Sequence, residues 1–302
     1  MLKGIISAVL ATLFWSGNLI IARGLNEQIP PVGFAFWRWV IAIILLTPFA
    51  LPLLLEKRAL LLRHKYFITI SALFGVTVFN TFLYIASETI SAINLSLISV
   101  SLPVFILIIS HIWLKEPFNM KNTIGISVAM AGILLLISKG NWSELLQLDG
   151  QQPGNYWMLA ATVSFALYSV MLKRKPAEIS ATLYLYSSFI IGLVLLSPFY
   201  LWEHLHVEVV RFSWITLPAF LYVGLFASIL SYFLWNQSIY LLGPSKAAPM
   251  YYLIAVFSTL GAWVLLNESI TVIHLISMAL IITGIIVTNL KFSTTPKSAD
   301  SD

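Results

Sequence analysis

The chain has 302 residues, of which 59% are hydrophobic and 10% are charged, and its mean hydropathy is +0.92. Soluble domains carry about 25% charged residues, so this composition excludes a water-soluble globular fold. The net charge of +5 does not indicate a nucleic-acid partner, because the basic residues form no stripe with interleaved aromatic side chains. The absence of cysteine excludes a disulfide framework and a thiol nucleophile.

Apolar runs of roughly 20 residues, the length of a membrane-spanning helix, follow one another along the chain. The first run is too long for a signal-peptide core and lacks an A-x-A cleavage site, so we interpret it as the first span. We expect an all-α integral membrane protein with ten transmembrane helices. They are predicted over residues 4–23, 31–54, 66–87, 92–113, 122–138, 154–173, 180–202, 214–238, 245–266 and 271–290.

The positions of Lys and Arg predict the orientation of these spans, because cytoplasmic loops carry the excess of both residues. With the N-terminus inside, 13 of the 17 basic residues are cytoplasmic and only Arg23, Lys139 and Arg211 are external, while Arg38 lies within a span. We therefore predict a multi-pass protein of the cell membrane (inner or plasma membrane), with both termini in the cytoplasm.

An internal repeat appears when the sequence is shifted by 150 to 152 residues, with several matches that agree in order and shift. Since each copy holds five spans, an odd number, the second copy is inverted in the membrane, an arrangement that recurs among secondary transporters. At a shift of 150, Ala11-Thr12 meets Ala161-Thr162, Trp15 meets Phe165 and Thr47-Pro48-Phe49 meets Ser197-Pro198-Phe199; at 152, Leu114-Lys115-Glu116 meets Leu266-Asn267-Glu268 and Ala131-Gly132-Ile133 meets Thr283-Gly284-Ile285.

The repeat predicts the domain organisation. Residues 1–138 form the first five-helix repeat and residues 154–292 the second. Residues 139–153 form an external linker between them. Residues 293–302 are polar and too short to fold alone, so we expect a disordered cytoplasmic tail.

Several motifs carry a family resemblance: FWSGN at 14–18, FWRW at 36–39, LISVSLPVF at 97–105, WLKEP at 113–117 and LLNES at 265–269. Over residues 4–291 the chain resembles the ten-helix drug/metabolite transporter (DMT) superfamily, in its form with two EamA repeats. The resemblance implies an exporter whose third, fourth, eighth and ninth spans line a central cavity. One departure is that Ala255 stands where the second repeat often keeps a counterpart of Pro103, which puts a symmetric pair of kinked helices in doubt.

Arg38 is the most informative single residue. It follows Pro31 by seven residues, which at 1.5 Å per residue places it about 10 Å below the outer boundary. In one interpretation it faces the cavity and binds an anionic group such as a substrate carboxylate. In the other it snorkels to the interface, or caps carbonyls and fixes helix packing. The sequence leaves both open.

Two prolines and three acidic residues add further expectations. Pro103 is predicted near the middle of the fourth span, where it frees a carbonyl toward a cavity or only bends the helix. Pro249 is predicted near a helix start. Glu88, Glu116 and Glu268 fall near span ends, which disfavours a buried carboxylate as a proton relay.

Polar and aromatic side chains gather on the spans that the resemblance assigns to the cavity. Asn80 and Tyr84 lie four residues apart and so share a helix face. Trp15 and Phe165 occupy matching repeat positions, as a gate or as ordinary packing. Each polar residue either contacts substrate or holds helices together. The predicted substrate-binding residues are Trp15, Asn18, Arg38, Asn80, Tyr84, Ser99, Ser101, Tyr168, Trp235, Asn236 and Tyr251.

These features predict a secondary transporter that exports small metabolites, foremost amino acids or related amphipathic compounds, by alternating access to a central midplane cavity. Efflux of multiple drugs or toxic compounds is the alternative. An integral membrane enzyme is disfavoured, because the sequence shows no H-E-x-x-H, no G-x-S-x-G and no close pair of buried acids. We expect no catalytic residue, metal or cofactor, and a monomer whose partners are the bilayer and a small-molecule substrate, not nucleic acid.

Overall fold

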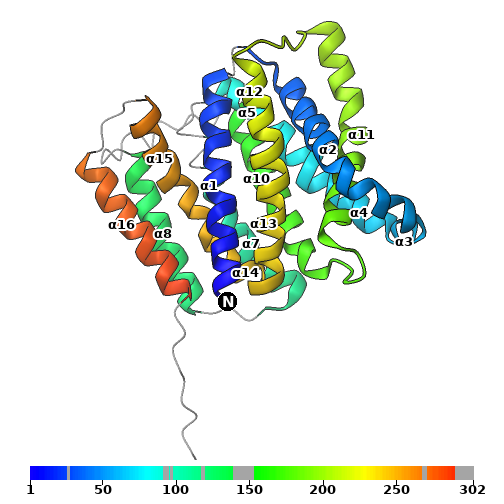
Figure 1. Cartoon of the computed structure of the whole chain (residues 1–302). Helices are drawn as coiled ribbons and strands as arrows, with labels where there is room; N and C mark the ends of the chain where they lie inside the picture. The colour runs from blue at the N-terminus through cyan, green and yellow to red at the C-terminus, as the bar shows by residue number, and fades with distance from the viewer. Residues whose placement is uncertain are drawn as a thin grey trace, which may run out of the picture.

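Long helices run roughly up and down through the structure, a computed structural model that describes residues 1–25, 28–90, 95, 98–116, 120–138, 153–266 and 271–289 (Figure 1). No strand occurs in these ranges. The helices are α1 (Leu2–Leu25), α2 (Pro31–Glu56), α3 (Arg58–Arg63), α4 (Lys65–Ala72), η1 (Leu73–Val78), α5 (Phe79–Thr89), α7 (Leu102–Leu114), α8 (Met120–Ile137), α10 (Pro153–Met171), η2 (Leu172–Arg174), α11 (Ala181–His206), α12 (Thr216–Tyr222), η3 (Val223–Leu230), α13 (Ser231–Leu242), α14 (Pro244–Ala247), η4 (Ala248–Tyr252), α15 (Leu253–Leu266) and α16 (Val272–Asn289).

Large apolar side chains cover the outside of the bundle as well as its interior. Phe49 and Ile112, for example, are each 72% exposed, as expected for a surface that lipid tails cover. Among the described residues, six helices are long and apolar enough to cross a membrane, and α7, α8 and α16 are apolar over shorter lengths. The expected all-α fold is confirmed over the described residues, while the count of ten spans stays a prediction. The six are Leu2–Ala22, Pro31–Glu56, Lys65–Thr89, Pro153–Arg174, Ala181–His206 and Thr216–Leu242.

The fourth and ninth predicted spans differ from simple helices. The helix α7 begins at Leu102, and residues 92–94, 96 and 97 of the predicted fourth span lie outside the described residues, so the place of Pro103 within that span stays a prediction. Pro103 lies in the first turn, where its missing N–H has no helical partner to lose. In the ninth span a 3-10 turn, η4, precedes α15, and Pro249 lies in its first turn as expected. The two helices α7 and α15 thus begin at nearly equivalent repeat positions, although Ala255 replaces the proline.

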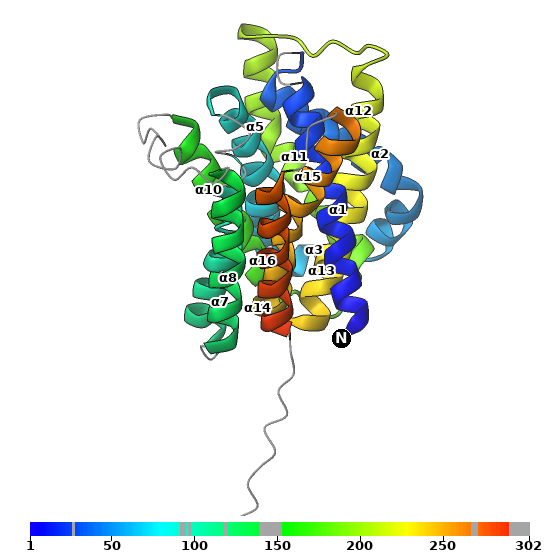
Figure 2. The same cartoon turned by 90° about the vertical axis from the view of Figure 1, so that its left-hand side faces the viewer.

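The helices α8 and α16 make the most extensive contact in the bundle (Figure 2). Glycines allow their backbones to touch, a common device between membrane helices. A Cβ atom added at Gly284 would lie 2.5 Å from the Gly125 carbonyl oxygen, and one added at Gly132 would lie 2.8 Å from the Ser277 carbonyl oxygen. Since position numbers rise along one helix as they fall along the other, the pair is antiparallel.

These two contacts exchange with each other under the repeat. A shift of 152 residues carries Gly125 onto Ser277 and Gly132 onto Gly284. The contact of Gly125 with Gly284 therefore becomes the contact of Ser277 with Gly132. Such reciprocal pairing, in which i contacts j and j contacts i, is the pattern of a two-fold axis.

The close approach makes Gly284 sensitive to any side chain. We expect Gly284→Ala to lower the free energy of unfolding by about 1–3 kcal/mol, because the new methyl group meets backbone atoms that cannot move aside. Thermal unfolding of purified protein in detergent measures the effect. The matched control is Thr283→Ala, an exposed neighbour on the same helix, which should melt like the unsubstituted protein. If both variants unfold at the same temperature, the close packing of α8 against α16 at Gly284 is contradicted.

Candidate functional site

Two π-helical segments lie in the middle of the bundle. The segment η1 lies between α4 and α5, and η3 lies between α12 and α13. They begin at Leu73 and Val223, which are 150 residues apart and therefore occupy equivalent repeat positions. A π turn disturbs the usual α-helical pairing and occurs frequently at functional sites. Here side chains donate to its carbonyl oxygens.

Arg38 is buried between η3 and α5, with only 1% of its surface exposed. The snorkelling alternative is therefore wrong, because the guanidinium turns into the protein. It does cap a carbonyl, so it also holds helices together. Its Nε donates to Ser228 Oγ at 2.7 Å, Nη1 donates to Asn80 Oδ1 at 2.6 Å and to Tyr84 Oη at 2.9 Å, and Nη2 donates to the Ala227 carbonyl at 2.8 Å.

All of these partners are neutral. Arg38 also lies over the Trp39 ring, 4.9 Å from its centroid. Within the described ranges no carboxylate forms an ion pair with it. Arginine stays charged in proteins, so hydroxyl, amide, carbonyl and ring dipoles stabilise a net positive charge at this point.

Asn80 links the arginine to the aromatic interior. Its amide nitrogen donates to Tyr232 Oη at 3.0 Å, and that hydroxyl donates to the Gly75 carbonyl of η1 at 2.5 Å. Asn80 and Tyr84 bond to the same guanidinium nitrogen, which confirms that they share a helix face. Tyr84 in turn donates to Asn18 Oδ1 at 3.1 Å. A continuous chain of hydrogen bonds thus joins α1, α2, α5 and α13.

Five buried aromatic rings pack next to this network, and we call them the aromatic cluster: Trp15, Phe165, Tyr232, Trp235 and Tyr251. The Trp15 ring centroid lies 5.4 Å from that of Phe165, 5.9 Å from Tyr232, 5.5 Å from Trp235 and 6.1 Å from Tyr251. Trp15 Nε1 donates to the Ala227 carbonyl at 3.0 Å. The cluster and Arg38 therefore meet at a single carbonyl oxygen.

An amide with spare donor capacity lies beside the cluster. Tyr168 Oη donates to Asn236 Oδ1 at 2.9 Å, while the Asn236 side-chain nitrogen is buried and has no hydrogen-bond partner in the described structure. Such a donor is costly to leave unpaired. Trp235 Nε1 is satisfied by Ser169 Oγ at 3.0 Å.

Two predicted residues lie at the start of α7. Ser101 donates to the Ile98 carbonyl at 2.5 Å, so its hydroxyl stabilises the turn that precedes the helix. Ser99 is buried in the same turn region. Neither bonds to Arg38. Glu268, one of the acidic residues considered in the sequence, lies outside the described residues.

Glu203 is a site residue that the sequence reasoning missed. It is only 4% exposed, and its two carboxylate oxygens accept hydrogen bonds from the backbone N–H of Val32 at 2.9 Å and of Gly33 at 2.5 Å. These are unpaired donors at the start of α2, and the N-cap residue Pro30 has no side chain that could accept them. The Pro-Pro start of the span was the signal that an acceptor from elsewhere is needed.

A second carboxylate contact closes the opposite end of the bundle. The helix α7 ends at Leu114, and Ser245 in α14 donates a short hydrogen bond to the carboxylate of Glu116. Arg174 in η2 adds a bond to the Trp113 carbonyl at 2.9 Å. Glu116 thus connects the end of α7 to α14 in the second half of the chain.

The sequence profile of the EamA-like transporter family matches the chain twice, over residues 2–138 and residues 152–290. The chain belongs to the EamA-like transporter family. The resemblance inferred from the motifs is therefore confirmed. As an EamA-like protein the chain is a multi-pass membrane protein and a transporter. No group of His, Cys, Asp or Glu suited to a metal ion occurs in the part of the chain that the structure describes.

Relatives match this chain over nearly its whole length. An uncharacterized transporter of Archaeoglobus fulgidus is 24% identical over 289 residues, 93% of this chain and 96% of the relative. A probable amino-acid metabolite efflux pump of Salmonella typhimurium is 24% identical over 292 residues, 92% of each chain. A protein of known crystal structure matches with a TM-score of 0.75 at 17% identity, covering 95% of this chain and 96% of the other, which shows a shared fold.

The neutral partners of Arg38 should matter for stability. Ser228→Ala removes the acceptor of Arg38 Nε, and we expect a loss of about 1–3 kcal/mol because a buried charged donor is left unpaired. Thermal unfolding in detergent measures it. Ser197→Ala is the matched control, since Ser197 bonds only to the Leu193 carbonyl of its own helix. A loss of stability no larger than that of the control would contradict a stabilising role for the hydrogen bond between Arg38 and Ser228.

Proposed function

We propose that this transporter exports small amphipathic metabolites, with amino acids as the first candidates, by alternating access to a site between Arg38 and the aromatic cluster. The observation that carries the proposal is a buried arginine whose partners are all neutral. Ionisable residues inside membrane proteins commonly line substrate paths. A substrate carboxylate would supply the missing negative charge.

The geometry suits a zwitterion. A carboxylate accepts paired hydrogen bonds from a guanidinium, and it would displace a neutral partner such as Tyr84 or Ser228. The electron-rich faces of Trp15 and Trp235 suit a substrate ammonium or an apolar side chain. Asn236 offers an unpaired amide donor for a further substrate oxygen.

We further propose that residues 1–138 and 154–292 form two inverted five-helix repeats and that the site lies at their interface. The equivalent starts of η1 and η3 and the reciprocal contacts of α8 with α16 support this arrangement. Arg38 and Asn80 come from the first repeat, whereas Ser228 and the Ala227 carbonyl come from the second. Substrate binding would therefore act on both halves.

Access would alternate through the two carboxylate contacts. Glu203 joins α11 to the start of α2, and Glu116 joins α14 to the end of α7. Each contact links the two halves, and the two lie at opposite ends of the bundle. Releasing one while the other holds would open the site to one side of the membrane at a time.

Efflux of diverse apolar compounds is the second candidate function. It is favoured by the aromatic cluster, which can bind flat or apolar molecules through dispersion and stacking without a charge. Such transport would not depend on the charge balance at Arg38. A substitution that changes the charge balance at Arg38 therefore distinguishes the two functions.

Placing a carboxylate next to Arg38 tests the substrate class. Asn80→Asp supplies an internal counter-ion, so we expect amino-acid transport to fall at least tenfold because the substrate carboxylate meets a neutralised site, about 1.4 kcal/mol of lost binding or more. Uptake of labelled amino acids into proteoliposomes measures transport.

The matched control is Asn80→Ala, which removes the same amide without adding charge. We expect it to melt at a lower temperature than Asn80→Asp and to keep more transport. Faster transport by Asn80→Asp than by Asn80→Ala would refute the anion site. Apolar efflux that is kept alike in both variants, with no amino-acid transport by the unsubstituted protein, would favour the second candidate.

The Glu116 contact can be tested with cysteine labelling, because the chain contains no native cysteine. Ser110 in α7 is fully buried, so Ser110→Cys should react slowly with a membrane-impermeant maleimide. Adding Ser245→Ala removes the donor to Glu116 and should raise the labelling rate severalfold. Lys173→Cys, at an exposed position outside this contact, is the control and its labelling rate should not change. An unchanged rate at position 110 would exclude the proposed gate.

A further inference from the structure

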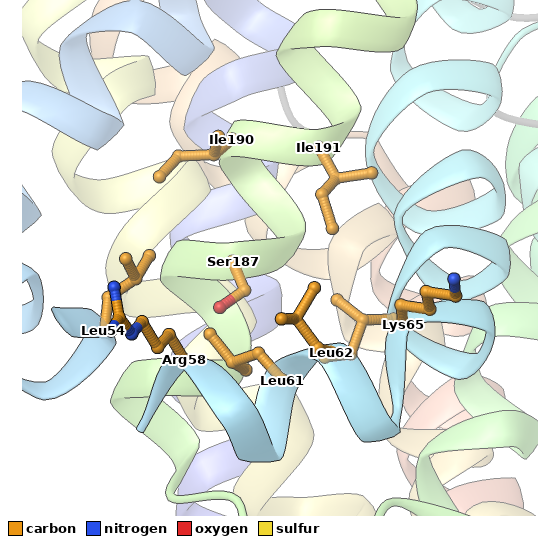
Figure 3. Close-up of a pocket in the computed structure, with 9 residues that line it drawn as sticks. Leu54, Arg58, Leu61, Leu62, Lys65, Ser187, Ile190 and Ile191 are labelled. Carbon is orange, nitrogen blue, oxygen red and sulfur yellow. The ribbon is translucent and has the colours of Figure 1, made fainter. Parts of the chain in front are cut away.

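A groove of about 290 Å³ opens on the side of the bundle, at the corner where α2 ends, α3 crosses and α4 begins (Figure 3). The wall behind it is the middle of α11. Its sides are formed by Leu54, Leu61, Leu62, Ile190 and Ile191. At this size it lies at the low end of the range of about 300–1,000 Å³ for small-molecule sites, so it accommodates part of a long molecule.

The groove is apolar inside and cationic at its ends. Figure 3 shows the Arg58 guanidinium at one end and the Lys65 ammonium at the other. Lys65 Nζ lies over the Tyr66 ring, 5.1 Å from its centroid. Ser187 is the other polar residue of the lining, and its hydroxyl already donates to the Leu183 carbonyl at 2.7 Å. The interior thus offers hydrocarbon contacts, and the ends offer positive charge.

The surrounding charges leave this corner positive. Lys57 directly precedes the short helix α3, and Arg63 is its last residue. The acidic side chains nearby are Glu56 and Glu178, and Glu178 pairs with His64, 3.4 Å from Nε2. Within the described residues neither Arg58 nor Lys65 forms an ion pair. Both side chains are exposed and free to meet an anion.

The corner also lies at a membrane surface. The helices α2 and α4 are both parts of membrane-spanning segments. At this corner α2 ends and α4 begins. Exposed Leu55 and Leu62, each more than 60% accessible, alternate with the basic residues. Such a mixture of leucine and Lys or Arg is typical of the boundary between acyl chains and head groups.

We propose that the groove binds an anionic phospholipid of the bilayer. One acyl chain lies against the apolar walls, and the phosphate lies at the level of Arg58 and Lys65. The lipid would span the seam between the first half of the chain, which supplies α2, α3 and α4, and the second half, which supplies α11. The inference requires only membrane embedding and is independent of the transported substrate.

Charge rather than hydrophobicity would select the lipid. Apolar walls gain little over the surrounding acyl chains, because lipid tails are as apolar as leucine. Each Lys or Arg near an anionic head group contributes roughly fivefold in affinity, the equivalent of about 1 kcal/mol. Two of them predict a preference for an anionic over a zwitterionic lipid of roughly 25-fold.

Lipid titration of the purified full-length protein tests the site. Phosphatidylglycerol and phosphatidylcholine with the same acyl chains are added in neutral detergent, and bound lipid is counted by native mass spectrometry. We expect phosphatidylglycerol to bind roughly 25-fold more tightly. Arg58→Gln with Lys65→Gln should remove this preference. Lys3→Gln with Lys173→Gln, an equal change of charge at exposed positions elsewhere, should keep it.

Two further arms separate lipid from free anion. Leu62→Trp narrows the groove without changing charge and should weaken phosphatidylglycerol binding, whereas water-soluble glycerol phosphate should not compete with the lipid. The proposal is overturned if the two lipids bind equally, if both double variants lose the preference alike, if glycerol phosphate competes as well as the lipid, or if Leu62→Trp binds phosphatidylglycerol unchanged.

Discussion

The structure depends on how a permanent charge is stabilised where, within the described residues, no carboxylate pairs with it. Arg38 sits inside a membrane protein, and four neutral acceptors replace its hydration shell. Those acceptors come from α5 and from η3, so the charge can be stable only when distant segments are correctly assembled. Removing any acceptor leaves a charged donor unpaired, which is why the same residues organise both the packing and the candidate site.

The π segments explain how the backbone can take part in this arrangement. A regular α-helix uses its carbonyl oxygens internally, whereas the altered pairing in η1 and η3 lets Gly75 and Ala227 accept bonds from side chains. Gly75 also lets the Tyr168 ring approach, since an added Cβ atom would lie 2.3 Å from that ring. The two irregular segments thus place backbone acceptors and aromatic rings around one point.

Sequence patterns predicted the local features and missed the long-range ones. The shared face of Asn80 and Tyr84 follows from helical spacing, and the contact of Trp15 with Phe165 follows from the repeat. The partner Ser228 lies 190 residues from Arg38, and Glu203 lies 170 residues from Gly33, separations at which one sequence gives no pairing signal.

The hydrogen bonds of Glu203 to the backbone at the start of α2 have an electrostatic consequence. A helix N-terminus carries roughly half a positive charge, and Glu203 now offsets it about 9 Å, or six residues, above Arg38. If the end of α11 moves away from α2, Glu203 no longer offsets this partial charge. The electrostatic potential along α2 then becomes more positive. Opening this end would then strengthen the attraction of Arg38 for an anion, so one carboxylate would set both the closure of this end and the affinity of Arg38 for an anion.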